Sequence, residues 1–179
     1  MMSSTTTEQK LLSLREEFDQ SFTRAAGGPR PSELDFLALV VAGDAYAIRL
    51  SEVQSLHADR KLVAAPSLLP ELLGVCGFRS VLTPVYDLAQ LLGYGPGRAA
   101  RWLLVAEGAQ PIAFAFEGFD SHLRVALESV SAPETSNAGT TAVAGAVRSH
   151  AMTRPLLHLP SLVEVIARRI KALRPLQER

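Results

Sequence analysis

Residues able to carry out acid–base, nucleophilic or metal chemistry are few in this chain and lie far apart. Its four histidines are His57, His122, His150 and His158. No two of them have the spacing of about two to four residues that is typical of a metal-binding pair. Asp120, Ser121 and His122 are consecutive, but neighbours along a strand point to opposite faces, so they do not predict a catalytic triad. Cys76 has neither a CxxC partner nor an adjacent base, which favours a small buried side chain over a nucleophile. The sequence thus predicts a protein that is not an enzyme and needs no metal or cofactor.

Two other motifs are typical of ligand binding but lack essential parts here. The segment GYGPG at 93–97 has the glycines of a phosphate loop without the Lys-Ser/Thr that ends one, so we interpret it as a linker. The basic residues after Ala167 have no aromatic residues among them. They therefore favour a solvated helix face over a platform for stacking bases.

Composition and charge bound the class of protein. The 179 residues include 18 basic and 18 acidic side chains, so no overall field draws the chain to nucleic acid or to an anionic membrane. A hydrophobic content of 47% is ample for the core of one domain or two small subdomains. The single cysteine excludes an internal disulfide and suits a reducing compartment. Without a signal peptide, or an apolar run near the roughly 20 residues that span a bilayer, we expect a soluble, cytoplasmic protein with no membrane insertion.

Arg79 is a charged residue between two apolar stretches, so its position calls for a structural or functional explanation. Both stretches have strand propensity, and Pro84 must lie at an edge or a bulge because proline donates no hydrogen bond to a sheet. Asp87 is expected to cap a short helix over 88–92, which Gly93 ends.

The side chain of Arg79 has two interpretations. A guanidinium makes planar, directional hydrogen bonds and is enriched at interaction hot spots, which favours contact with a partner. Alternatively, its stem covers apolar surface while its head is solvated. The nearby Gly74 and Gly77 are expected to meet a backbone need, either a positive φ or a close approach.

The first 33 residues are predicted to form an arm separate from the body at 34–179. Residues 1–7 are polar and expected to be disordered, and 8–26 is predicted to be an amphipathic helix, followed by a Gly/Pro linker. Its apolar stripe consists of Leu11, Leu14, Phe18 and Phe22. This helix either folds back on the body or binds a partner.

From residue 34 the chain reads as short strands in two similar halves. The first half has predicted strands from Phe36, over 46–50, over 54–58 and on both sides of Arg79, with a short helix over 68–73 capped by Ser67. The second half has predicted strands over 102–107, 112–116, 122–130, 142–147 and 154–158, a long loop at 131–141, and a final helix over 162–173. The apolar face of that helix consists of Leu162, Val165, Ile166, Ile170 and Leu173. Without βαβ alternation, the pattern predicts antiparallel barrels at about 34–93 and about 94–160, followed by a C-terminal helix at about 161–174.

The stretch around Arg79 resembles the signature hairpin of the CheW family of chemotaxis coupling proteins, G-x-x-N-L-R-G-x-x-x-P-V-x-D-L. It is matched by Gly74, Phe78 (for Leu), Arg79, Pro84, Val85, Asp87 and Leu88. The start of the body resembles the family's opening strands through Phe36, Tyr46, Ile48 and Val53, and Ala65-Pro66 lies at the usual spacing before Gly74. The resemblance implies a mainly β fold of two five-stranded SH3-like barrels packed together, with helices at both ends.

For function, the resemblance implies a non-enzymatic adaptor that couples a methyl-accepting chemoreceptor to a CheA-type histidine kinase. Members place the receptor's cytoplasmic tip in a groove between the barrels and the kinase's regulatory domain on a barrel end. Positions associated with these contacts are Val53, Gly74, Phe78 and Arg79. Three positions depart from the family, with Gly77 for its Asn, Ser80 for its Gly and Ser55 for its acid, and they suggest a divergent coupler that keeps one partner only.

Two further alternatives stay open. Val53, Leu56 and Phe78 either line an apolar groove for a helical tip or belong to the core. In a different class, the barrels would form an SH3-like module that binds nucleic acid or a small ligand, which zero net charge and the lack of an aromatic patch disfavour.

Overall fold

The computed structural model describes residues 33–95, 100–132, 142–149 and 152–173. The predicted arm helix over 8–26 and nearly all of the loop at 131–141 lie outside these residues. The chain divides after Pro31, close to the predicted end of the arm at residue 33. The body is described below.

The fold is mainly β, as predicted. Up to residue 95 the elements are β1 (Glu33–Val41), β2 (Asp44–Arg49), the 3₁₀ turn η1 (Leu50–Glu52), β3 (Val53–Ala58), β4 (Leu72–Phe78), β5 (Val81–Asp87) and α2 (Leu88–Leu91). From residue 100 they are β6 (Trp102–Ala106), β7 (Ala113–Phe116), β8 (Gly118–Ala126), the 3₁₀ turn η2 (Leu127–Ser129), β9 (Val130–Ser131), β10 (Val143–Ser149), β11 (Met152–Leu157) and α3 (Leu159–Leu173).

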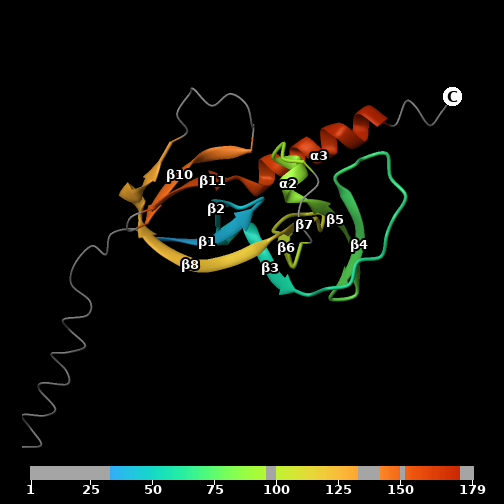
Figure 1. Ribbon diagram of the computed structural model, residues 1–179, viewed down its shortest axis with the longest axis horizontal. Coiled ribbons are helices and arrows are strands. Elements are labelled where there is room, and N and C mark those ends of the chain that lie inside the picture. The colour runs from blue at the N-terminus through green and yellow to red at the C-terminus, as the bar shows by residue number, and fades with distance from the viewer. Residues whose placement is uncertain (1–32, 96–99, 133–141, 150–151, 174–179) are drawn as a thin grey trace, which may run out of the picture. The chain divides into compact units, whose positions relative to one another are not determined.

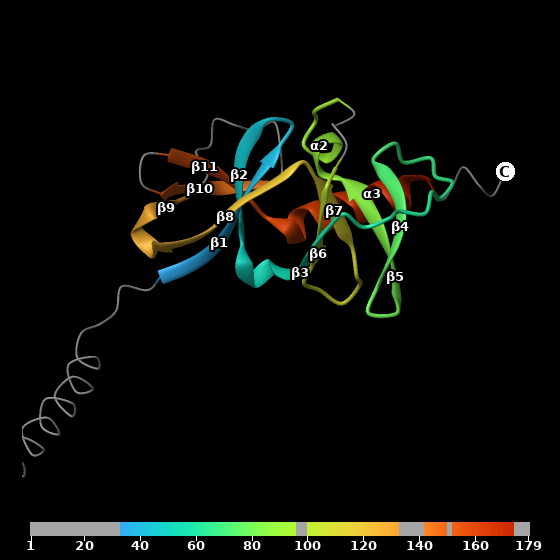
Figure 2. The same ribbon diagram turned by 60° about the horizontal axis from the view of Figure 1, so that its bottom comes forward.

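These strands form two sheets, which lie next to one another in Figures 1 and 2. One has the order β8-β1-β2-β11-β10-β9 and is called here the six-stranded barrel, although β9 contributes only two residues. The other, the five-stranded barrel, has the order β3-β6-β7-β5-β4. The predicted architecture of two packed SH3-like barrels is therefore confirmed.

The predicted boundary between the barrels, near residue 93, is wrong. β1 and β2 were expected in the first barrel, yet they pair with β8 and β11. In return, β6 and β7 pair with β3 and β5. The two halves of the chain thus exchange a strand pair, and neither barrel is formed from one continuous half.

The exchange follows from strands that are apolar on both faces. In β1, Leu37 and Leu39 belong to a large core that also includes residues of α2, β7 and α3, whereas Phe36 belongs to the core of the six-stranded barrel. In β6, Leu104 belongs to the same large core and Leu103 to that of the five-stranded barrel. Because successive side chains point to opposite faces, each of these central strands joins a barrel interior to the shared core. Sequence order alone does not show this two-sided burial.

The two barrels share a local feature, a glycine with positive φ at a close approach of two backbone segments, and the sequence pattern did not predict that the second barrel repeats it. Gly74 in β4 has a φ of +143°, and a Cβ there would overlap the backbone carbonyl of Val63. Gly145 in β10 has a φ of +142°, and a Cβ there would overlap the carbonyl of Ser131. The pairing register shifts next to both glycines. Each barrel thus has a glycine where a second segment crosses its strand closely.

The helix predicted over 68–73 is not formed, because Leu72 and Leu73 already belong to β4. The Ser67 hydroxyl does accept a hydrogen bond from the Leu69 amide, at 2.9 Å, as a capping residue would. Pro70 follows, however, and a residue before proline disfavours the helical conformation. The hydrogen bond therefore closes an isolated turn.

The predicted helix after Asp87 is confirmed. The Asp87 carboxylate accepts hydrogen bonds from the amides of Ala89 and Gln90, at 2.9 and 3.4 Å. Pro84 is accommodated because the pairing of β5 with β7 begins only at Val85, so the strand is locally an edge at the proline.

The C-terminal helix α3 begins at Leu159, slightly before the predicted start. Its buried residues are Leu159, Leu162 and Ile166, but Ile170, predicted on the same face, is 38% exposed. Two contacts hold the helix to the body. Glu52 accepts a hydrogen bond from the Leu159 amide at 2.8 Å, and the buried Glu71 forms an ion pair with Arg169 at 2.6 Å.

Candidate functional site

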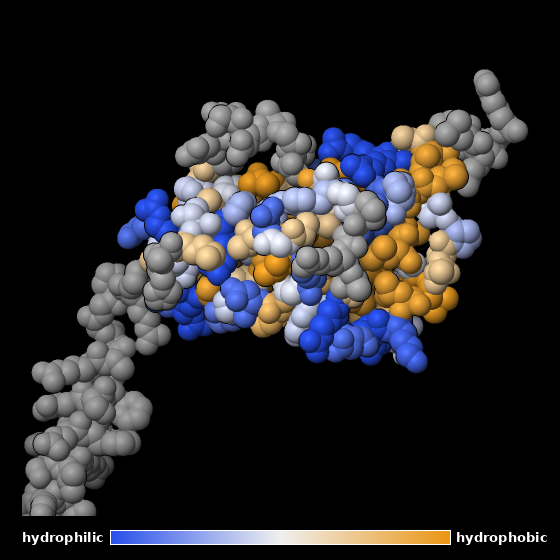
Figure 3. Space-filling view, viewed as in Figure 1, coloured by the Kyte–Doolittle hydropathy of each residue, from blue (hydrophilic) through white to orange (hydrophobic). Residues whose placement is uncertain are grey.

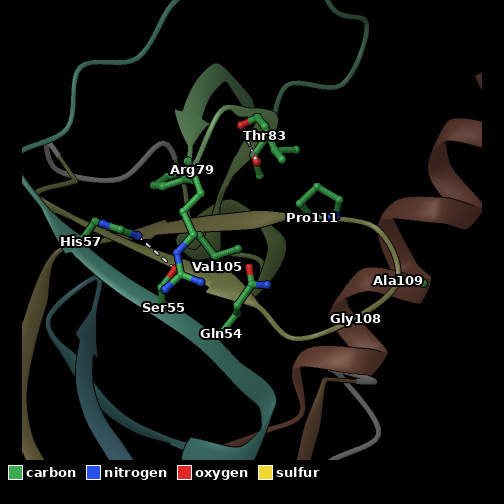
Figure 4. A pocket seen from close by; sticks show the side chains of 11 residues that line it. Gln54, Ser55, His57, Arg79, Thr83, Val105, Gly108, Ala109 and Pro111 are labelled. Atoms are coloured by element: carbon green, nitrogen blue, oxygen red, sulfur yellow. Dashed lines mark hydrogen bonds between the residues drawn. The ribbon is translucent and has the colours of Figure 1, made fainter.

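A pocket of about 290 Å³ opens at one end of the five-stranded barrel. It is formed where the start of β3, the turn between β4 and β5, and the loop between β6 and β7 come together (Figure 4). The lining residues are Gln54, Ser55, His57, Phe78, Arg79, Val81, Thr83, Val105, Gly108, Ala109 and Pro111. Three residues selected from the sequence, Ser55, Phe78 and Arg79, therefore surround one cavity.

A bulge at the start of β3 turns polar side chains into this pocket. Val53 pairs with Ala106 and Ser55 with the next residue, Val105, so Gln54 is an extra residue in the strand. A bulge of this kind re-aims the side chains that follow it. Ser55 and His57 then share the face that lines the pocket, and their side chains are hydrogen-bonded at 3.0 Å.

Arg79 projects from a two-residue turn with an unusual backbone. Phe78 pairs with Val81, so Arg79 and Ser80 form the whole connection between β4 and β5, with φ values of +45° and +67°. A type I′ hairpin turn requires positive φ at both central residues and usually has Asn-Gly there. Neither residue here is a glycine, and strained residues of this kind occur preferentially at functional sites.

His57, Phe78 and Arg60 pack together beside the pocket. The rings of His57 and Phe78 have centroids 4.7 Å apart, and the Arg60 guanidinium lies 5.6 Å from the centre of the Phe78 ring. Arg60 also donates a hydrogen bond to the carbonyl of Gly77 at 2.7 Å. Burial lowers the pKa of His57, and the positive charges of Arg60 and Arg79 lower it further. This neighbourhood is therefore cationic, with a neutral imidazole at its centre.

The other selected residues lie outside the pocket lining. Val53 and Leu56 pack against the large shared core, so they do not line this cavity with Phe78. Gly74 is buried further along β4, where its positive φ and the close approach of Val63 confirm the backbone requirement expected of it. The same expectation is wrong for Gly77, since it has no positive φ and a Cβ there would meet no atom within 4 Å.

Sequence reasoning missed Gln54, His57, Arg60 and Thr83 as neighbours of Arg79. The alternation of β3 would have placed His57 on the same face as Ser55, since residues two apart in a strand share a face. No local signal predicts Thr83 or the loop at Gly108 and Pro111, because they reach the pocket only through the pairing of β5 and β6 with β7.

The lowered pKa of His57 predicts a pH dependence of stability. The unfolded chain binds the proton more tightly than the folded protein, so the free energy of unfolding should fall as pH drops below 6.5, towards the lower pKa of the folded state. Above that window this contribution is fully present. Urea unfolding at pH values on both sides of 6.5 should show a smaller pH-dependent loss in His57→Gln than in the wild type. An equal loss in both proteins would contradict this role for His57.

A second exposed surface is apolar. Figure 3 shows hydrophobic side chains gathered over the side of the body where β4 and the segment before it lie. In that segment Val63 is 66% and Leu68 is 62% exposed. Exposed apolar patches of this kind mark protein interaction sites.

The consecutive Asp120, Ser121 and His122 do not form a catalytic unit. Asp120 forms an ion pair with Arg154 at 2.8 Å, and the His122 Nε2 atom lies 2.9 Å from a carboxylate oxygen of Asp35. Within the described ranges, no group of three His, Cys, Asp or Glu side chains is arranged to hold a metal ion. None of the helices in the part of the chain that the structure describes is long and apolar enough to cross a membrane.

Two SH3-like barrels packed on a shared core are the architecture of a CheW-type protein. The family model of the CheW-like domain matches residues 35–167, which is most of the chain. The protein therefore belongs to the CheW-like domain family, a family of adaptors and scaffolds in chemotaxis signal transduction.

Comparison with solved structures supports the same fold. The chain is similar to the crystal structure of the scaffolding protein TtCheW from Thermoanaerobacter tengcongensis, with a TM-score of 0.64 and 17% sequence identity. The alignment covers 70% of this chain and 88% of that one. At this identity the likeness establishes the shared fold alone. The chain has no match among curated proteins.

Proposed function

We propose that this protein is a cytoplasmic, non-enzymatic adaptor that couples a methyl-accepting chemoreceptor to a CheA-type histidine kinase. The observation that supports this most directly is the pocket around Arg79, because it combines the family's signature arginine with a strained turn and a cationic surround. An adaptor acts by fixing where two partners sit relative to one another, so its binding energy is used for geometry.

Two chemically different surfaces suit chemically different partners. The pocket at the barrel end is cationic and polar, whereas the patch at Val63 and Leu68 is apolar. Charged complementarity gives specificity and apolar burial gives affinity, so the two surfaces favour chemically different contacts.

The first test is a pull-down of the purified chain against a receptor tip and a kinase regulatory domain, each by itself. Binding of both supports the two-partner adaptor. Ser55, Gly77 and Ser80 depart from the family's residues and suggest a variant of the proposal in which only one partner is retained. Binding of one partner alone would favour that variant. Binding of neither would reject the adaptor function.

Charge reversal at the pocket should weaken one of these interactions. Arg79→Glu is expected to reduce partner affinity by more than about 1 kcal/mol, as for a hot-spot residue, while leaving the thermal midpoint within a few degrees. The matched control is Arg148→Glu, an exposed arginine on β10 of the other barrel. If Arg79→Glu unfolds the protein, Arg79 is structural and the docking role is wrong.

The apolar surface should behave independently of the pocket. Leu68→Ser removes an exposed apolar side chain and is expected to lower the affinity for the partner that Arg79→Glu leaves unaffected, by about 1 kcal/mol. Titration calorimetry of both variants against each partner would test this. If the two substitutions weaken the same partner only, the two surfaces form a single interface.

A further inference from the structure

The lining of the pocket has an unbalanced charge. Among its eleven residues Arg79 is the one with a full positive charge, and none is Asp or Glu. The remaining polar groups include the hydroxyls of Ser55 and Thr83, the Gln54 amide and the His57 ring. In Figure 4 the Arg79 side chain extends into the cavity towards the Ser55 side.

Arg79 has no polar partner within the described part of the chain, where no hydrogen bond or ion pair involves its side chain. The neighbouring Arg60 differs, because its guanidinium is bound to the Gly77 carbonyl and lies over Phe78. Two carboxylates of β3 and its flanking turns already have partners, since Glu52 binds the Leu159 amide and Asp59 binds Arg101. Arg79 is exposed, so its guanidinium is solvated and bound by no carboxylate of the described chain, which leaves it available to a partner.

The shape and chemistry of the pocket suit one acidic side chain. A guanidinium presents parallel N–H donors that match the two oxygens of a carboxylate. A cavity of about 290 Å³ has room for a single side chain. The Gln54 amide can donate a further hydrogen bond to a carboxylate, whereas the Thr83 hydroxyl already donates to the Val81 carbonyl at 3.4 Å.

We propose that this pocket receives an Asp or Glu side chain of the protein that docks on the barrel end, with Arg79 as its ion-pair partner. The inference rests on the proposed adaptor function and deepens it, because it names the group that the partner contributes. The residue at position 55 determines whether the carboxylate comes from this chain or from the partner. An acidic residue at that position would supply the carboxylate from within the chain, whereas Ser55 leaves the place for the partner's side chain.

The test is Ser55→Glu in the full chain, compared with Ser55→Gln, which has nearly the same size without the charge. Ser55→Glu should bind the partner at least about tenfold more weakly than Ser55→Gln does, with a thermal midpoint equal to or above that of the wild type. The partner used is whichever of the receptor tip and the kinase domain loses affinity with Arg79→Glu. Equal or tighter binding by Ser55→Glu would overturn the proposal while leaving the adaptor function intact.

A second measurement does not depend on the partner. Capped glutamate, titrated into ¹⁵N-labelled protein, should shift the amide resonances of Ser55, Arg79 and Gly108, and capped glutamine should not. Arg79→Gln should abolish these shifts. No shift with capped glutamate, or a stronger response to inorganic phosphate at the same residues, would overturn the carboxylate site. If the shifts appear but neither partner binds in the pull-down, the adaptor function fails and the pocket chemistry stands.

Discussion

Gly74→Ala is expected to destabilise the protein by about 3 kcal/mol or more, which is at the high end for a single substitution. Gly74 has a φ of +143°, a conformation that residues with a side chain rarely adopt, and a Cβ would overlap the carbonyl group of Val63. That carbonyl accepts a hydrogen bond from the Val75 amide at 2.8 Å, so the backbone there is not free to move away. Urea unfolding at neutral pH would measure the loss.

The matched control lies three residues along the same strand. Gly77 has no positive φ and open space where a Cβ would lie, so Gly77→Ala should change stability by less than about 1 kcal/mol, in either direction. If both substitutions cost the same, the backbone at Gly74 tolerates a side chain and the argument from close approach fails. The family resemblance associates Gly74 with partner contacts and places Gly77 where the family has Asn, and this pair of variants separates a packing role from a binding role.

Arg169→Met is expected to cost about 2 kcal/mol of stability, because it leaves the buried Glu71 carboxylate without its partner, with solvent partly screening the 45% exposed Arg169. Glu71 is 2% exposed and its carboxylate lies 2.6 Å from the Arg169 guanidinium on α3. The charge of Glu71 also affects Tyr86, whose pKa is raised first by burial and then by that carboxylate. Chemical unfolding, with hydrogen exchange of the α3 amides, would show whether the helix loosens before the rest of the body.

Two controls separate this buried pair from the general charge of the helix. Arg168→Met removes the neighbouring exposed arginine and should be nearly neutral. The double variant Glu71→Met/Arg169→Met should recover most of the loss, because a buried pair replaced by apolar residues of similar volume is often neutral. A double variant that is no better than Arg169→Met would mean that the helix is held by the guanidinium itself and not by compensation of Glu71.

Local features of the fold could be predicted because local chemistry decides them. The Asp87 cap needs only a carboxylate before a short apolar run, and the structure has both of its hydrogen bonds. The strands around Arg79 and the two apolar strands from Phe36 and Trp102 follow from hydrophobic runs bounded by turn residues. The helix predicted over 68–73 does not form because Pro70 disfavours the helical conformation of the residue before it, although Ser67 does cap a turn.

The candidate site was predicted in part. The motif selected Ser55, Phe78 and Arg79, which line the pocket, and it also selected Val53 and Gly74, which lie elsewhere. His57 was assessed only for metal spacing, although its place two residues after Ser55 puts it on the same face. Strand pairing brings Thr83 and Gly108 into the lining of one pocket, and a linear pattern has no counterpart of this.

By itself, the sequence determined the class of fold, the position of the signature hairpin and its arginine, and the short helix that follows, since each depends on residues within a few positions of one another. Only the tertiary structure decided which strands share a barrel. β1 and β6 are apolar on both faces, so the pattern of each permits a place in either barrel, and the choice depends on how side chains from distant segments fill the shared core. The charge balance of the pocket also depends on tertiary structure. Strand pairing determines which side chains lie next to Arg79, and none of those that line the pocket is a carboxylate.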